Sequence, residues 1–313
     1  MPPSTDCIVN GAELFTGTFS PGITIPTGLK QLNQALGGGY RKGETTMYAS
    51  ANGDGKSVMA VQTVGQMIRD GHKVLMVSTE ETDRQFTMRL LSNRCQVDYG
   101  VLLDYQNPNA EIPGAELPIV PPFLMANAQT AALAHQLIDD ARKHLTLADW
   151  TNDTHSLTGE LEQIILSVEQ TGFRPDVVIF DWVGGAILQD RNADSRRLIL
   201  EEAVNAFTSI CRRRNIVGIV FAQLDKKQST NKSWVTMSML SESKTMTNRI
   251  HNFIGITGLR PKDKDQGGVD PAKLPRQYFC VDKCRNGPGG RFAVNRNFKY
   301  MRFTESPTLL IGI

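Results

Sequence analysis

The apolar positions of this chain fall into short runs, rich in β-branched residues, that are separated by stretches with helical spacing. The runs cover residues 45–50, 73–78, 176–181, 216–222, 253–259 and 277–282. Runs of this length and composition are typical of buried strands. Because strands that alternate with helices form parallel sheets, the pattern predicts an α/β fold with a mostly parallel, twisted sheet flanked by helices.

Two helices are predicted directly from the spacing of apolar residues. The first covers about residues 57–70, with an apolar stripe of Val58, Val61, Met67 and Ile68. The second covers about residues 195–214, with a stripe of Leu200, Val204, Phe207 and Cys211. Stripes of this kind face the core of a domain.

The domain organisation is predicted from changes in composition. Residues 1–25 mix Pro, Gly, Thr and Ser with few periodic apolar positions, which indicates an arm or linker. Residues 26–313 are expected to form one domain. Within it, residues 105–122 are rich in Pro, Asn and Gly and read as an irregular insertion.

Composition narrows the class of protein. The 313 residues are 40% hydrophobic, which supports a sizeable core. No apolar run is long enough to span a membrane and no secretory signal is recognisable, so we expect a soluble, cytosolic protein without a membrane partner. The net charge is only +2, from 34 basic and 32 acidic residues, so contacts with DNA must come from local basic clusters.

The cysteines predict no chemistry. Their number, five, is odd, and they form no CxxC pair, so neither a disulfide framework nor a zinc site is indicated. Cys280 and Cys284 lie four residues apart in a predicted strand, so we expect both to point to one face of the sheet.

The strongest chemical signal is the segment SANGDGKS at residues 50–57, between a predicted strand and a predicted helix. It matches the phosphate-loop template G-x-x-x-x-G-K-[ST], except that Ser50 replaces the first glycine. Gly53 and Gly55 let backbone amides curl around phosphate oxygens, and the helix N-terminus adds positive potential. The predicted site for ATP or another NTP comprises Ser50, Ala51, Asn52, Gly53, Asp54, Gly55, Lys56, Ser57 and Val58.

Within this loop, Lys56 is predicted to reach the β- and γ-phosphates, while Ser57 is predicted to hold Mg²⁺ through its hydroxyl. The metal also needs a carboxylate. Asp181 ends the apolar run at 176–181, where such a group belongs, although an aspartate also commonly follows a strand in a plain turn. Asp54 brings negative charge into the loop unless its side chain faces solvent.

Hydrolysis further needs a group that orients or deprotonates the attacking water. Glu80 and Glu81 follow the run at 73–78 and are both candidates. Gln223 follows the run at 216–222, and its amide is placed to sense the γ-phosphate. All three are expected at the carboxyl edge of the sheet, where open α/β folds hold their ligands.

Several segments resemble the RecA-like motor domain of DnaB-type replicative helicases, in the family's order, over about residues 26–303. They are residues 27–44, 74–91, 177–182 and 220–227, together with DKCRNGPGG at 282–290, which is similar to the family's K-x-R-N-G-P-x-G hairpin. The resemblance implies that the catalytic glutamate is Glu80 and that Gln223 belongs to the family's glutamine motif. It also implies that Lys283 and Arg285 enter the neighbouring subunit's active site, as an arginine finger does.

The same resemblance implies a homohexameric ring, with residues 1–25 as the arm that docks on an adjacent subunit. The family's N-terminal collar and primase domains have no recognisable counterpart in the sequence, so primase, a loader or a separate collar protein are partners that the resemblance only allows. Residues 241–252 depart from the acidic segment that the family carries there. A viral or plasmid-encoded version would fit such a reduced architecture.

Two loops that face the central channel in that family correspond to residues 184–197 and 225–238. For contacts with the backbone of single-stranded DNA, the resemblance and the side-chain chemistry together favour Lys226, Lys227, Asn231, Lys232 and Ser233. Arg191, Arg196 and Arg197 are weaker candidates, since charge runs are usually solvated surface. Trp234 is suited equally to stacking on a base and to packing within the protein.

Together these features predict an NTP-driven ring translocase that unwinds DNA during replication. Two alternatives stay open at the level of sequence. A recombinase or recombination mediator of the same superfamily would form open filaments. A nucleotide-binding scaffold without unwinding activity is suggested by Ser50 and Asp54.

Overall fold

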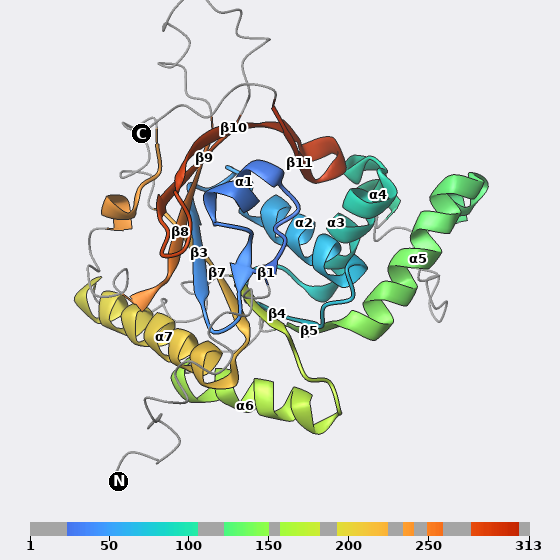
Figure 1. Cartoon of the computed structure of the whole chain (residues 1–313). Coiled ribbons are helices and arrows are strands. Elements are labelled where there is room, and N and C mark those ends of the chain that lie inside the picture. Colours follow the sequence, from blue (N-terminus) through green and yellow to red (C-terminus); the bar gives the residue numbers. More distant parts are fainter. Residues whose placement is uncertain are drawn as a thin grey trace, which may run out of the picture.

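A central sheet with helices on both faces dominates the computed structural model of the chain (Figure 1), which describes residues 24–105, 122–149, 157–181, 193–224, 234–240, 249–258 and 277–306. Within these residues the sheet has nine strands in the order β11-β10-β9-β8-β3-β7-β6-β4-β5. The parallel strands are β3 (Thr45–Ser50), β4 (Val74–Ser78), β5 (Leu145–Asp149), β6 (Val177–Asp181), β7 (Val217–Gln223) and β8 (Asn252–Gly258). The antiparallel strands are β9 (Gln277–Lys283), β10 (Gly290–Asn297) and β11 (Arg302–Glu305).

The helices divide between the two faces of the sheet (Figure 1). One side carries α1 (Lys30–Ala35), α2 (Lys56–Arg69), α3 (Asp83–Cys95), α4 (Tyr99–Tyr105) and α5 (Ala128–His144). The other side carries α6 (Leu157–Gln170) and α7 (Ala193–Arg214). Short 3₁₀ helices cover Pro122–Ala126, Met237–Leu240 and Phe298–Tyr300.

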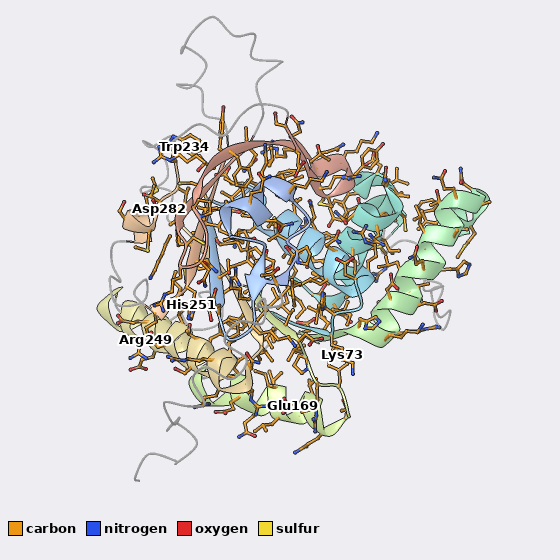
Figure 2. All side chains as sticks on the ribbon, in the orientation of Figure 1. Lys73, Glu169, Trp234, Arg249, His251 and Asp282 are labelled. Atoms are coloured by element: carbon orange, nitrogen blue, oxygen red, sulfur yellow. The ribbon has the colours of Figure 1, made fainter. Side chains whose placement is uncertain are left out.

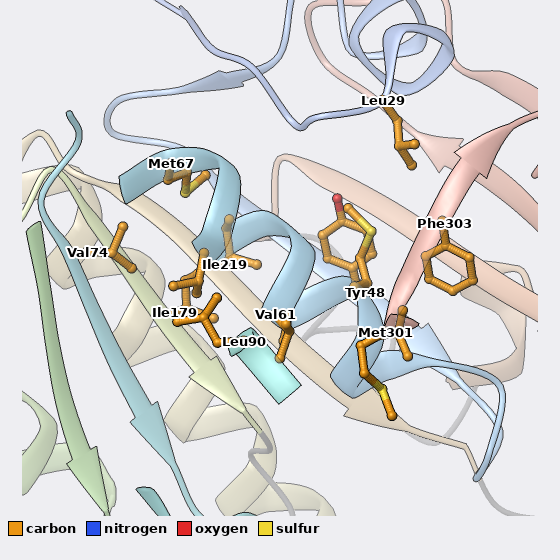
Figure 3. Packing of buried hydrophobic residues seen from close by; sticks show 14 of the residues in the cluster. Leu29, Tyr48, Val61, Met67, Val74, Leu90, Ile179, Ile219, Met301 and Phe303 are labelled. Atoms are coloured by element: carbon orange, nitrogen blue, oxygen red, sulfur yellow. The ribbon is translucent and has the colours of Figure 1, made fainter. Parts of the chain in front are cut away.

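The core consists of two apolar layers, one on each face of the sheet. Figure 3 shows the first layer, in which Val61 and Met67 of α2 pack near Ile179 and Ile219 of the sheet. In the second layer, residues such as Phe207 of α7 pack against the opposite side chains of the same strands. Because both faces are covered, the central strands are buried at nearly every position, and β4, β6 and β7 read as continuous apolar runs in the sequence.

The predicted α/β architecture is confirmed, including the parallel sheet and the antiparallel C-terminal hairpin region. β3 covers the predicted residues 45–50, and the other predicted strands and both predicted helices differ from the observed elements by one or two residues at their ends. The helices α3, α4, α5 and α6 and the strand β5 were not predicted. The predicted insertion lies, at residues 106–121, outside the described residues.

The prediction that Cys280 and Cys284 point to one face is wrong. Phe279 and Val281 pack in the first apolar layer, so Cys280 points to the other face, whereas Cys284 packs against that first layer. The cause is an irregularity in the pairing of β8 with β9, where Ile254 pairs with Val281 but the preceding Phe253 pairs with Lys283. A bulge of this kind inserts one residue and reverses the alternation of faces beyond it.

At the N-terminal side, the predicted arm lies outside the described residues up to residue 23. The next two residues form β1 (Thr24–Ile25), which pairs with β2 (Tyr40–Arg41), and Ile25 is buried. The segment that precedes the phosphate loop is therefore packed on the domain from Thr24 onward. Among the described helices, none is both long and apolar enough to cross a membrane.

Candidate active site

The ends of neighbouring parallel strands bring the predicted polar residues to one edge of the sheet. Ser50 of β3 pairs with Gln223 of β7, and Ser78 of β4 pairs with Asp181 of β6. β6 and β7 are themselves neighbours, so these residues lie along one continuous carboxyl edge. The phosphate loop leaves β3 at the same edge and leads into α2. The edge predicted from sequence to hold the ligand is therefore built by the central strands of the sheet.

The backbone of the phosphate loop depends on two of its glycines. Gly53 has φ +80° and no heavy atom within 4 Å of a Cβ placed on it, so its surroundings are open. Gly55 has φ +99°, and a Cβ there would lie 2.7 Å from Cζ of Phe303 and 3.1 Å from Cζ of Phe298. Both residues adopt left-handed conformations that favour glycine. Because the first amides of a helix have no acceptor within the helix, those of α2, which starts at Lys56, are suited to phosphate oxygens.

Ser50, which departs from the loop template, fits its position without conflict. It is fully buried as the last residue of β3, in extended pairing with Gln223, and its hydroxyl donates to the carbonyl of Ala51 at 3.1 Å. This position therefore has no need for the left-handed conformation that glycine provides. The replacement of the first glycine leaves the geometry of the loop intact.

Asp54 does not face solvent. Its Oδ1 would lie 2.6 Å from a Cβ built on Gly258, so the carboxylate is turned toward the end of β8, where only glycine leaves room. The side-chain amide of Gln277 donates to the carbonyl of Asp54. The negative charge of Asp54 is thus directed toward β8 and β9, at the side of the loop.

Lys56 and Asp181 face the same space at the carboxyl edge. The side chain of Lys56 is 8% exposed, and its Nζ lies 3.4 Å from Oε2 of Glu80. Asp181 is buried, and burial raises the pKa of its carboxyl to about 7, against the opposing effect of the Lys56 charge. Its Oδ1 is buried and, among the described residues, accepts no hydrogen bond. A buried carboxylate oxygen without a donor is suited to a cation.

These oxygens fit Mg²⁺. This cation prefers oxygen ligands and is usually held by one or two protein groups, with water and phosphate oxygens completing its shell. Ser57, in the first turn of α2, and Asp181 are the residues that would hold it. Within the described part of the chain, no group of three or more His, Cys, Asp or Glu side chains could hold a metal without a ligand's help. Ser57 and Asp181 would supply two oxygen ligands, and water and phosphate oxygens would complete the shell of Mg²⁺.

The two adjacent glutamates have different environments. Glu81 is nearly buried, and its Oε2 forms an ion pair with Nε of Arg89 at 3.1 Å. Arg89 in turn lies over the ring of Tyr99, 4.9 Å from its centroid. Glu80 is half-exposed beside Lys56. Because Arg89 engages Glu81, the geometry favours Glu80 as the group that meets the attacking water. No pattern in the sequence pointed to the Arg89 contact.

Lys283 and Arg285, called here the basic pair, lie at the opposite edge of the sheet from the phosphate loop of the same chain. β9 starts at Gln277, opposite Gly258 and next to Asp54, and ends at Lys283, opposite Phe253 at the start of β8. At a rise of about 3.3 Å per residue, Phe253 and Gly258 are roughly 17 Å apart. This span is longer than a side chain, so Lys283 and Arg285 lie out of reach of the phosphate loop of the same chain.

The electrostatics agree with this placement. Burial, followed by the charges of Arg285 and Lys283, lowers the pKa of His251 to about 4, and His251 lies just before β8 at the amino edge. In Figure 2, Trp234, Asp282 and His251 follow one another from the carboxyl edge, where Trp234 lies beside Tyr278, toward the amino edge, where His251 lies. Burial and the charge of Arg285 also lower the pKa of Lys283, whereas Arg285 itself is exposed. The basic pair is thus presented on the surface.

Most of the predicted DNA-contacting residues lie outside the described part of the chain. Lys226, Lys227, Asn231, Lys232, Ser233 and Arg191 lie outside the described residues, and of Arg196 and Arg197 only the helical backbone is described. Trp234 is half-buried, with its ring 5.2 Å from that of Tyr278 and the guanidinium of Arg291 at 5.0 Å from its centroid. Of the two roles left open for Trp234, packing within the chain is the one the structure supports.

One prediction concerns the buried carboxyl at the metal site. Asp181→Asn is expected to stabilise the nucleotide-free protein at pH 8, and less so at pH 5. The folded-state pKa of about 7 lies above that of an unfolded chain, so the fold favours the protonated form. Protonated Asp181 contributes its full share to the free energy of unfolding below pH ~4, and this share is lost as the pH rises to 7. The loss is on the order of 4 kcal/mol at most.

Thermal melting of both proteins without nucleotide or Mg²⁺ measures this difference. Asp176→Asn serves as the matched control, since it removes an exposed ion pair with Lys42 at the opposite edge and should not stabilise the fold at either pH. An Asp181→Asn effect that is the same at pH 5 and pH 8 would contradict the assigned pKa.

The fold, together with the polar residues at the carboxyl edge of the sheet, is that of NTPases with a phosphate loop and a RecA-like sheet. The family model described as the DnaB-like helicase C terminal domain matches residues 24–305, nearly the whole chain. The chain therefore belongs to the family of DnaB-like helicase C-terminal domains, and the predicted resemblance is confirmed.

Solved structures agree at the level of the fold. The chain is similar to a solved ATPase domain, with a TM-score of 0.72 and 15% identity over 98% of this chain and 100% of that one. It is also similar to a DnaB-like replicative helicase studied with primase, with a TM-score of 0.69 and 14% identity over 98% of this chain and 68% of that one. At these identities the likeness establishes a shared fold.

Curated relatives match only a segment. The DNA repair protein RadA of Aquifex aeolicus (strain VF5) is 38% identical over 85 residues, which are 27% of this chain and 18% of RadA. RadA of Mycolicibacterium smegmatis is 32% identical over 83 residues, 26% of this chain and 18% of that protein. The chain spans about a fifth of the length of these relatives.

Proposed function

We propose that this chain is an NTP-driven ring translocase that moves along single-stranded DNA and unwinds duplex DNA during replication. Residues 26–313 form its ATPase domain and residues 1–25 an arm that docks on an adjacent subunit of a homohexamer. The observation that carries the proposal is the distance between the basic pair and the phosphate loop of the same chain. Because β8 and β9 hold the pair away from this loop, we propose that it serves the site of another copy.

At the proposed site, the amides of the loop and the ammonium group of Lys56 bind the β- and γ-phosphates of ATP or another NTP. Ser57 and Asp181 hold Mg²⁺, which when bound offsets the negative charge of the phosphate oxygens. Glu80 orients the attacking water and accepts its proton. Lys283 and Arg285 of the neighbouring subunit stabilise the charge that develops on the transferred phosphoryl group.

Movement on DNA is proposed to start from Gln223. This residue ends β7 next to Ser50, and residue 224 donates its amide to the Ser50 carbonyl at 2.9 Å. Contact of the Gln223 amide with the γ-phosphate would therefore be transmitted directly to the loop that follows. There Lys226, Lys227, Asn231, Lys232 and Ser233, with Arg191 from the other loop, are proposed to hold the DNA backbone. Primase, a loader or a collar protein would act on the assembled ring.

Strand displacement tests this function. With Mg²⁺ and ATP, the protein is expected to separate a forked DNA duplex, and single-stranded DNA is expected to stimulate hydrolysis. Hydrolysis per subunit should fall as the protein is diluted, because the site needs two copies. Hydrolysis that is insensitive to DNA and to dilution, without unwinding, would exclude the proposal.

A recombinase or recombination mediator is the second candidate, favoured by the segment that is 38% identical to the DNA repair protein RadA of Aquifex aeolicus. Electron microscopy with nucleotide and single-stranded DNA separates the two, since a helicase ring is closed and six-fold whereas a recombinase forms a helical filament. The scaffold alternative loses support from the fit of Ser50, and measurable phosphate release would exclude it.

A further inference from the structure

The turn that carries Arg285 is docked on its own subunit by close backbone packing. Gly289 donates its amide to the carbonyl of Ala35 at the end of α1, at 3.0 Å. A Cβ on Gly37 would overlap the carbonyl oxygen of Asn286, and one on Gly287 would overlap that of Ala35. Residues 285–289 therefore lie directly against the turn that follows α1, with no side chain between them.

A single carboxylate holds this turn from the side of the sheet. Glu44 is half-buried and lies immediately before β3. Its Oε1 accepts a hydrogen bond from the side-chain amide of Asn286, the residue after Arg285. Its Oε2 lies 3.5 Å from Nδ2 of Asn252, which is buried and also donates to the hydroxyl of Thr46 at 3.1 Å. Glu44 thus connects the turn to the amino ends of β3 and β8.

The charges at this edge suit an ionised carboxylate. Burial raises the pKa of Glu44, while the bonds from Asn252 and Asn286 and the charges of Arg41 and Arg285 oppose the rise. Arg41 is itself anchored, since its Nη2 donates to the carbonyl of Gly37 at 2.8 Å. The carboxylate therefore attracts the turn of the hairpin next to Arg285.

We infer that Glu44 is the positioning residue for the basic pair: by bonding Asn286 it fixes the turn so that Lys283 and Arg285 reach the neighbouring subunit's site. The inference rests on the proposed function, in which the pair acts in trans. An arginine on an exposed turn gains catalytic value only when its backbone is held, because misplacement by about 1 Å can cost on the order of 100-fold in rate. Glu44 lies just before β3, at the opposite end of that strand from the phosphate loop, so its role is to position the turn.

The test is hydrolysis by mixed assemblies. Glu44→Ala alone is expected to lower kcat at least ~10-fold while KM for the nucleotide stays within about twofold, because binding at its own loop is unaffected. Mixing it with Lys56→Ala is expected to restore hydrolysis. The Lys56→Ala subunit lacks a working site but brings a well-placed basic pair to the intact site of its Glu44→Ala neighbour. A folding defect in Glu44→Ala would not be restored in this way.

Three further proteins complete the design. Glu44→Gln keeps an acceptor for Asn286 and is expected to retain most of the activity. Asn286→Ala removes the same contact from the turn and should reproduce the Glu44→Ala behaviour, also where Glu44→Ala folds poorly. Glu162→Ala, which removes a carboxylate from an exposed ion pair with Arg213, is the matched control and should behave as the unmodified chain.

The outcomes separate this inference from the function on which it rests. In one outcome, hydrolysis recovers when Arg285→Ala is mixed with Lys56→Ala. If it does not recover when Glu44→Ala or Asn286→Ala is mixed with Lys56→Ala, only the role of Glu44 is overturned. Full activity of unmixed Glu44→Ala and Asn286→Ala does the same. If even the Arg285→Ala mixture stays inactive, the action of the pair in trans is wrong and the inference falls with it.

Discussion

Replacing Lys56 by alanine is expected to lower NTP hydrolysis at least ~100-fold, because positioned cations carry much of the stabilisation in phosphoryl transfer. The side chain of Lys56 is nearly buried, between Glu80 and the carboxyl edge. Its loss would also remove the cation that counters the burial of Asp181 and so raise the pKa of that carboxyl further above 7. Both effects weaken binding of a nucleotide with its metal.

A malachite-green phosphate assay together with the binding of a fluorescent nucleotide measures both losses. Lys42→Ala is the matched control, since Lys42 pairs with Asp176 at 2.7 Å at the opposite edge and is partly exposed. Exposed pairs of this kind contribute at most about 1 kcal/mol, so activity should change little. Hydrolysis by Lys56→Ala within a few-fold of the unmodified chain would show that the SANGDGKS loop is not the nucleotide site.

Arg285→Ala is expected to lower kcat by about 10³-fold, the lower end of what an arginine finger supplied in trans contributes. Nucleotide binding should persist, because Arg285 lies at the far edge of the sheet from the loop of its own subunit. The loss therefore appears in kcat and not in binding, unlike that of Lys56→Ala.

Single-turnover hydrolysis and nucleotide titration on the same preparation separate these quantities. Arg213→Ala, on α7, removes an exposed arginine whose Nη2 pairs with Glu162 at 2.8 Å and should leave both unchanged. An Arg285→Ala protein that hydrolyses normally would show that Arg285 has no catalytic role, whatever its effect on assembly.

The parts of the fold that were predictable are those buried on both faces. β4, β6 and β7 are apolar at nearly every position and β3 is buried at every position, because helices cover the sheet on each side. Their sequence runs matched the observed strands closely. β5 lies at the edge of the sheet and is only half-buried, so its sequence LTLAD shows no continuous run. Exposure thus weakens the signal of a strand.

Helix α3 was missed although one signal was present. Its sequence mixes charged and polar residues with apolar ones and shows no clear stripe. However, Thr82 and Gln85 form a capping box, in which each side chain bonds the backbone of the other. The spacing of a threonine and a glutamine three residues apart is a recognised start of a helix and would have located it.

The candidate site was predictable wherever chain order fixes position. Ser50, Asp181 and Gln223 each end a parallel strand, so their common edge followed from the strand pattern. Contacts between distant segments did not follow. The choice between Glu80 and Glu81 depends on Arg89, and the packing of Gly55 depends on Phe303. No local pattern of residues encodes such contacts.

The position of Lys283 and Arg285 in the fold also depends on contacts that the sequence does not encode locally. The similarity of residues 282–290 to a family motif identified the basic pair, but only the pairing of β9 with β8 shows that it lies at the edge away from its own loop. That placement supports the proposal that two subunits share one site.

The central claim is that the loop of one subunit and the basic pair of another form one active site, and hydrolysis by an equal mixture of Lys56→Ala and Arg285→Ala subunits tests it most directly. Each variant alone should be almost inactive. In a randomly mixed ring, about one interface in four joins an intact loop to an intact basic pair. Hydrolysis by the mixture should therefore recover to a sizeable fraction of about one quarter of the activity of the unmodified protein. A mixture that hydrolyses no faster than its two components would contradict the shared site.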